Sequence, residues 1–204
     1  MKIIASLIYV LLLSGFAQGA TANPTKEVSD LLSRYDSFSG MFEQTLVNDK
    51  GESIQRSSGE FKIKRPGLFR WETFNPFPQL LVSDLDTLWL YDPDLEQVTI
   101  RSFASQVSQS PALLLSGNAD DIALFYDVSV IEAGERYRLV PKEASTFTQM
   151  ELQFDQQTLQ KIIVLDSLAQ TTTFNFSDIK TSQQFAPSIF NFEVPVGVDV
   201  LIDE

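Results

Sequence analysis

The chain of 204 residues contains no cysteine and no histidine. Without cysteine no disulfide can form, so a hydrophobic core alone must stabilise the fold. Without histidine the chain lacks the commonest general base, the commonest metal ligand and every Ser-His or Cys-His nucleophile pair. Only catalysis by carboxylates is left open, and we expect neither a cofactor nor a metal.

Two pairs of aspartates are the candidates for such catalysis. Asp84 and Asp86, like Asp92 and Asp94, have an i, i+2 spacing, and glycosidases do use pairs of acids. Both pairs lie in segments predicted to connect strands, where Asp side chains accept hydrogen bonds from nearby backbone N–H groups. These turns are also too short for the many oxygen ligands of a calcium site. We therefore expect turn formation and a protein that is not an enzyme.

Positive charge is scarce as well. The chain has 15 Lys and Arg against 27 Asp and Glu, which gives a net charge of −12. Such a surface repels nucleic acid and anionic lipid headgroups over a Debye length of about 8 to 10 Å. Nucleic-acid binding and stable residence on a membrane are therefore disfavoured.

The first 22 residues are typical of a secretory signal peptide. Lys2 precedes an eleven-residue, mainly apolar run from Ile3 to Leu13, which is too short to span a bilayer. Small residues follow, and we predict cleavage after Ala22, with Gly19 as the second choice. Residues 23–204 then form one exported, soluble domain, and loss of the one charge on Lys2 makes its net charge −13. No cysteine follows the apolar run, so no lipid anchor is expected there.

Most of the remaining chain alternates between apolar and polar residues with the period of two that indicates β-strands. Phe61 and Ile63, for example, alternate with Glu60, Lys62 and Lys64. Regular turn residues separate these runs. We predict a mainly β domain with one highly curved antiparallel sheet of about ten or eleven strands in meander order. The predicted strands are residues 40–47, 53–64, 68–73, 79–83, 87–91, 97–101, 124–130, 136–141, 146–154, 160–166 and 170–179, with an edge strand after Pro195.

Two short helices interrupt the strands. Residues 25–35 carry apolar side chains at i, i+3, i+4 and i+7, a stripe that would cover a sheet, with Thr25 as the predicted N-cap. Residues 110–117 have a Ser at the N-cap, Pro at the first helical position and a final Gly. This second helix is apolar on nearly every side, so it either plugs the core or lies over another apolar surface.

The interior of the sheet allows two interpretations. A closed barrel of about eight strands is just filled by its own side chains, and more strands enclose more space. A packed core and an unfilled cavity would both use the same inward-facing residues, so the pattern leaves both open. These residues are Phe42, Phe61, Ile63, Phe69, Trp71, Leu81, Leu90, Met150, Leu152, Phe154, Phe174 and Phe176.

The central segment KRPGLFRWE, residues 64–72, resembles the periplasmic outer-membrane lipoprotein carriers, the LolA-type lipoprotein chaperones. The similarity continues through residues 81–84 and 87–93, with further matches at 37–44 and 190–195. It thus covers essentially the whole mature chain. The missing cysteine after the signal separates the chain from the outer-membrane receptor, a lipoprotein with a similar fold.

This resemblance implies an unclosed, half-open antiparallel β-barrel whose short helices form a lid over a hydrophobic cavity. It also implies a function in the periplasm of a Gram-negative bacterium. The family takes acylated lipoproteins from an inner-membrane ABC transporter and hands them to the outer-membrane receptor. A monomer is expected, because a shuttle gains nothing from a permanent interface.

The resemblance further assigns roles to residues of the lid. Arg65 matches an arginine that hydrogen-bonds backbone carbonyls of the lid in the closed, empty state. The matching lid positions are Leu32 in the first helix and Leu115 and Ser116 in the second. Leu113 and Leu114 of the second helix join the residues expected to contact acyl chains.

Two aromatic residues near the cavity mouth, Phe69 and Trp71, match positions that line the cavity and help to contact the transporter. Among these, Phe69 is the expected partner contact. The main alternative to a carrier is a structural or interaction domain with a filled core. A carboxylate hydrolase that uses Asp84 and Asp86 is the third hypothesis.

Overall fold

The computed structural model describes residues 23–107 and 110–203, and the predicted signal peptide lies outside the described residues. In this part of the chain one 12-stranded sheet has the order β12-β6-β5-β4-β3-β2-β1-β11-β10-β9-β8-β7. The strands are β1 (Ser37–Val47), β2 (Ser53–Lys64), β3 (Leu68–Asn75), β4 (Gln79–Asp84), β5 (Thr87–Asp92), β6 (Gln97–Ser102), β7 (Tyr126–Glu132), β8 (Arg136–Pro141), β9 (Phe147–Asp155), β10 (Thr158–Asp166), β11 (Thr171–Thr181) and β12 (Asp199–Ile202).

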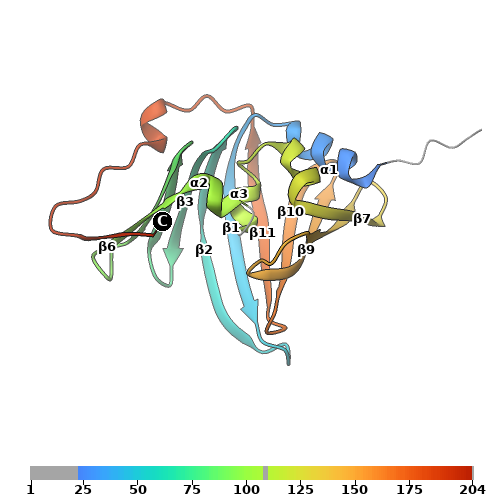
Figure 1. The fold of residues 1–204 in the computed structure, drawn as a ribbon, viewed down its shortest axis with the longest axis horizontal. Helices are drawn as coiled ribbons and strands as arrows, with labels where there is room; N and C mark the ends of the chain where they lie inside the picture. The colour runs from blue at the N-terminus through green and yellow to red at the C-terminus, as the bar shows by residue number, and fades with distance from the viewer. Residues whose placement is uncertain (1–22, 108–109, 204) are drawn as a thin grey trace, which may run out of the picture.

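The sheet consists of two meanders, β1 to β6 and β7 to β11, which are joined by antiparallel pairing of β1 with β11. Strands β12 and β7 stand at the two ends of the order, so the barrel is unclosed. The mainly β, curved and open architecture confirms the predicted fold class (Figure 1). The predicted edge strand after Pro195 is confirmed as β12, but it pairs parallel to β6 rather than antiparallel.

The first helix, α1 (Pro24–Ser33), is capped by Asn23 and not by Thr25 as predicted. The Asn23 side chain accepts hydrogen bonds from the backbone N–H groups of Thr25 and Lys26. Pro24 takes the first helical position, where its missing N–H removes no helical hydrogen bond. The apolar stripe, with Leu32 at its centre, faces the sheet as predicted.

The segment between β6 and β7 contains more helix than predicted. It forms α2 (Phe103–Val107), α3 (Pro111–Leu114), the 3₁₀ helix η1 (Ala119–Asp121) and α4 (Ile122–Phe125). The prediction of only two helices, and of a strand from residue 124, was therefore wrong. Ile122 and Phe125 are three residues apart, and this helical spacing lets both pack against the core. No helix in the described ranges is long and apolar enough to cross a membrane.

The helices lie together on one side of the curved sheet, near its centre and its β7 end (Figure 1). The other side carries the C-terminal segment, where η2 (Pro187–Phe190) packs against β3 and β4. The Phe192 ring there lies 6.1 Å from Trp89 and 5.9 Å from Tyr91. The tail thus covers the sheet face that points away from the helices.

Gly59 of β2 lies on the same sheet face as Phe61 and allows the close approach of β3 and of the Phe42 ring. A Cβ atom at this position would lie 1.9 Å from the Glu72 carbonyl oxygen and 2.7 Å from Phe42. We predict that Gly59→Ala lowers the free energy of unfolding by about 3 kcal/mol, at the upper end of typical overpacking costs. Urea denaturation would measure this, with Ser58→Ala as the neighbouring control. Equal stability of the two variants would contradict the prediction.

Candidate functional site

The side of the sheet beneath the helices carries one continuous apolar cluster. Of the predicted inward-facing residues, Phe174 and Leu81 are partly buried against this cluster. Leu90 lies on the same face beside Leu81 but is only partly buried and does not join the cluster. The buried members that had been predicted are Phe42, Phe61, Ile63, Phe69, Trp71, Met150, Leu152, Phe154 and Phe176 from the strands, with Leu32, Leu113, Leu114 and Leu115 from the helices.

Trp71 stands at the centre of an aromatic wall on this face. Its ring stacks on Phe42 at 4.0 Å, on Phe61 at 5.6 Å and on Phe69 at 5.9 Å between centroids. Phe176 meets the Trp71 ring edge-on at 6.3 Å. These rings come from β1, β2, β3 and β11, so the wall joins the two meanders. A large, rigid apolar surface of this kind suits contact with hydrocarbon.

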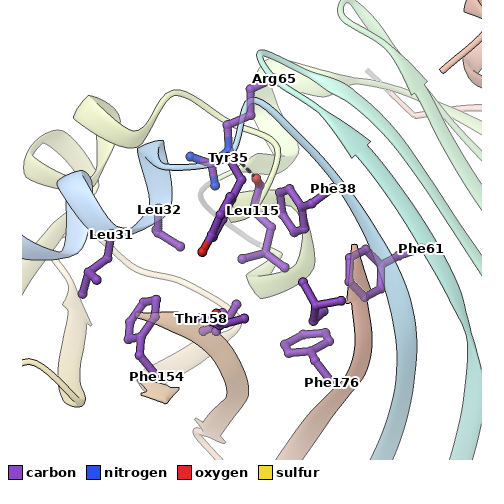
Figure 2. Close-up of a pocket in the computed structure, with 12 residues that line it drawn as sticks. Leu31, Leu32, Tyr35, Phe38, Phe61, Arg65, Leu115, Phe154, Thr158 and Phe176 are labelled. Atoms are coloured by element: carbon purple, nitrogen blue, oxygen red, sulfur yellow. Dashed lines mark hydrogen bonds between the residues drawn. The ribbon is translucent and has the colours of Figure 1, made fainter. Parts of the chain in front are cut away.

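A small cavity lies between this wall and the helices (Figure 2). Its volume is about 20 Å³. That is room for about one water molecule, whereas pockets for small molecules measure about 300–1,000 Å³. The space between the wall and the helices is therefore almost filled in this structure. The lining residues are Leu31, Leu32, Tyr35, Phe38, Phe61, Arg65, Leu115, Phe154, Thr158, Leu159, Phe176 and Ile179.

Half of this lining was not assigned to the site from the sequence. Leu31 and Tyr35 belong to the predicted helical stripe, which was a usable signal. Phe38 was missed because it lies between the predicted helix, residues 25–35, and the predicted strand, residues 40–47. Ile179 faces the cavity because the β1–β11 pairing contains an irregularity near Asp178, where φ is 53°. A bulge of this kind shifts the alternation, and its position is not visible in the alternation itself.

Arg65 connects the sheet to the helices from the β2–β3 turn. Its Nε donates a hydrogen bond to the Leu115 carbonyl oxygen at 2.9 Å (Figure 2). The Ser116 carbonyl, a further predicted acceptor, instead accepts from the backbone N–H of Gly67 at 2.7 Å. Leu32 contributes its side chain to the cavity beside Arg65. The turn thus makes two hydrogen bonds to the end of α3.

The Arg65 guanidinium is only partly satisfied in this position. Burial lowers its pKa to about 10, against the opposing effect of the charge on Asp36, so it is still a cation at neutral pH. Nη1 and Nη2 are buried and have no hydrogen-bond partner among the described residues. One charged hydrogen bond contributes about 1.5–3 kcal/mol, while each buried donor without a partner costs about 1–3 kcal/mol. The net contribution of the Arg65 hydrogen bond to the contact between sheet and helices is therefore small.

The far end of α1 is held by a second polar contact. The Tyr137 hydroxyl of β8 donates to Glu27 Oε2 at 2.8 Å. Burial, then the hydrogen bond to Glu27 and its charge, raise the pKa of Tyr137 to about 12. Glu27 is half-exposed, whereas Tyr137 is 1% exposed. This contact was not predicted, because neither residue is distinctive in the sequence.

Two further groups of predicted residues have clear positions. The Asp84 and Asp92 carboxylates accept hydrogen bonds from backbone N–H groups two and three residues later, which confirms that they cap turns. Phe69, the expected partner contact, is 0% exposed. A contact through Phe69 would therefore require the helices to move.

The fold and the site define a class: an unclosed β-barrel whose apolar interior is covered by short helices, as in the LolA superfamily. The chain belongs to the LolA family, because the model of the outer membrane lipoprotein carrier protein LolA matches residues 33–193.

Curated relatives cover almost the whole chain. An outer-membrane lipoprotein carrier protein of Azotobacter vinelandii is 38% identical and covers 96% of this chain and 98% of its own. A protein of the same name from Pseudomonas entomophila is 37% identical, and the alignment covers 95% of this chain and 98% of the relative. Another, from Hahella chejuensis, is 38% identical, and the alignment covers 96% of both chains.

Solved structures support the fold at lower identity. A LolA superfamily protein from Nitrosomonas europaea aligns with a TM-score of 0.51 and 14% identity over 82% of this chain and 96% of its own. An uncharacterized conserved protein from Thermus thermophilus aligns with a TM-score of 0.52 and 14% identity. The alignment covers 87% of this chain and 96% of that protein. At such identities the similarity concerns the architecture alone.

The Tyr137 contact predicts a pH dependence of stability. The folded-state pKa of about 12 lies above the ordinary tyrosine pKa of about 10, so the contribution of this group to stability is complete below pH 10 and is lost as the pH rises towards 12. We expect Tyr137→Phe to be less stable than wild type by about 1–2 kcal/mol at pH 7. The difference should shrink between pH 10 and 12. Urea titrations across this range would show it, and a difference that stays constant would contradict the assignment.

Proposed function

We propose that the protein is a periplasmic carrier that shields the acyl chains of lipoproteins and delivers them to the outer membrane. Membership of the LolA family and the near full-length carrier relatives support this function. The single structural observation that carries it is the aromatic wall around Trp71, buried beneath helices whose contact with the β2–β3 turn includes the incompletely hydrogen-bonded Arg65, the proposed latch. A core that the helices cover permanently would not need a buried cation, Arg65, between the sheet and the helices.

The energetics of acyl chains favour such a latch. Burial of a lipid anchor yields about 0.8 kcal/mol per methylene, so two or three long chains represent on the order of tens of kcal/mol. A carrier that used all of this free energy could not release its cargo. A competing closed state, in which the wall is covered by the protein's own helices, reduces the net affinity. The filled interior described above has this property.

We further propose two exchange partners, an inner-membrane lipoprotein-releasing ABC transporter and an outer-membrane receptor. The carrier would be monomeric, and residues 1–22 would be removed as a signal peptide during export. The net charge of −12 supports a protein that binds neither nucleic acid nor anionic membrane surfaces. The buried Phe69 would become available to a partner only after the helices move.

A structural or interaction domain is the second candidate, and the small volume of the cavity, about 20 Å³, is the observation that favours it. The two candidates differ in what happens on opening. A carrier takes up hydrocarbon into the space that the helices vacate, whereas an interaction domain keeps its core filled. Uptake of an acyl probe therefore separates them.

We predict that the mature protein binds a fluorescent fatty-acyl probe and that a triacylated peptide displaces it. The apolar wall supplies the binding free energy once the helices move. Probe fluorescence, titrated with the triacylated peptide and with its unacylated form as control, measures both steps. No uptake at any probe concentration would favour the interaction domain.

Arg65→Leu should open the empty protein, because it removes the charged hydrogen bond to Leu115. We expect binding of acylated lipoprotein to tighten about tenfold or more, the effect of a hydrogen bond of at least about 1.5 kcal/mol, and delivery to the receptor to slow. Arg70→Leu is a suitable control. Arg70 lies in β3, where it pairs with Glu72 of the same strand at 3.0 Å. Transfer from the Arg65 variant as fast as from wild type would refute this role.

A further inference from the structure

We infer that the lid has two mechanically separate halves: α1 is fixed to β8 by the Tyr137 hydroxyl, and α3 is the half that Arg65 releases. This inference rests on the proposed carrier function, because it states how the cavity of that carrier opens. It assigns to Tyr137 the role of a positioning residue, which keeps the apolar face of α1 over the cavity.

The attachment of α1 begins with Tyr137. Its buried hydroxyl donates to Glu27 Oε2, in the first turn of α1, at 2.8 Å. Tyr137 belongs to β8, so this hydrogen bond joins the helix to the second strand of the β7–β8 hairpin. A hydrogen bond to a carboxylate is also about twice as strong as a neutral one.

Further contacts attach α1 to the same hairpin. Ser29 Oγ lies 3.2 Å from Asp120 Oδ1, which links α1 to η1. The helix also packs against β7 and α4. In turn, Lys142, just after β8, donates from its backbone N–H to Phe125 and from its side chain to Ala123 in α4. The helices α1, η1 and α4 therefore form one body with the β7–β8 hairpin.

In contrast to α1, α3 is attached to the other meander of the sheet. This helix packs against α2, and α2 packs against β6, in the other meander of the sheet. The end of α3 is joined to the β2–β3 turn by the bonds from Arg65 to Leu115 and from Gly67 to Ser116. Both bonds come from residues that flank Pro66. Displacement of this one turn would break both, and neither involves α1.

The cavity lies along the boundary between the two halves. Figure 2 shows Leu31 and Leu32 of α1 on one side and Leu115 with Phe61 and Phe176 on the other. Loss of the Arg65 contact would let Leu115 withdraw while α1 stays in place. The incoming acyl chain would then lie between a fixed apolar helix and the aromatic wall. Without the Tyr137 contact, α1 would lose this fixed position.

Hydrogen–deuterium exchange tests the two halves separately in the empty, full-length mature protein. We expect Arg65→Leu to speed exchange in residues 111–117 about tenfold and to leave residues 24–33 within about twofold of wild type. Tyr137→Phe should instead speed exchange in residues 24–33 about tenfold and leave residues 111–117 within about twofold of wild type. Tyr91→Phe is the matched control, because Tyr91 packs on Phe192 on the opposite sheet face. It should change neither segment.

Two variants of Glu27 distinguish the hydrogen bond from a general loss of packing. Glu27→Gln keeps an oxygen acceptor for the Tyr137 hydroxyl, so exchange in α1 should lie between wild type and Tyr137→Phe. Glu27→Ala removes the acceptor at a half-exposed position and should match Tyr137→Phe, which keeps the test valid if the tyrosine variant folds poorly. Equal exchange in α1 for wild type and Glu27→Ala would overturn the role of Tyr137.

The lid would be one body, contrary to the inference, if Arg65→Leu released residues 24–33 and 111–117 to the same extent. Binding of the fatty-acyl probe is scored independently. If the exchange pattern is as expected but the protein does not bind the probe, the two-part lid is supported and the carrier function is rejected. Probe binding with equal release of both segments would retain the carrier and reject the two-part lid.

Discussion

Arg65 is buried between the sheet and the helices. Its Nε donates to the Leu115 carbonyl, and Nη1 and Nη2 have no hydrogen-bond partner among residues 23–107 and 110–203. In the proposed carrier, this contact would set how readily the helices leave the aromatic wall. A fully paired arginine would close the barrel permanently, while an aliphatic side chain would leave the helices with no directional bond to this turn. In the proposed carrier, the intermediate arrangement would keep the closed state only slightly favoured, so that a hydrocarbon ligand could displace the helices.

The topology explains why one turn can have this effect. The two meanders are joined in the sheet through the β1–β11 pair, and β12 and β7 stand at the two ends of the strand order. Each meander carries its own helices, α2 and α3 on one and α1 with α4 on the other. The β2–β3 turn belongs to the first meander, and Arg65 and Gly67 bond from it to the residues that end α3. A small movement there changes the contact between two larger bodies.

The sequence predicted the strands well because one face of each is buried, and the alternation around Phe61 and Ile63 records this directly. It also identified Arg65, but only through resemblance to a family, since a single cation before a turn has no distinctive pattern. Leu124 was placed in a strand because a short apolar run fits both helix and strand. Ile179 and the Tyr137–Glu27 contact were missed because they depend on a bulge and on a pairing across 110 residues.

The small cavity, which favours an interaction domain when taken alone, also fits a carrier whose helices cover the apolar wall while it is empty. An open cavity the size of several acyl chains would leave the aromatic wall of Trp71, Phe42 and Phe61 in contact with water, at about 25 cal/mol for each Å² exposed. Covering the wall with Leu32 and Leu115 removes this cost in the empty protein. The same leucines then compete with the ligand for the wall. The free energy that keeps the empty carrier closed is thus the free energy by which its affinity for cargo is lowered.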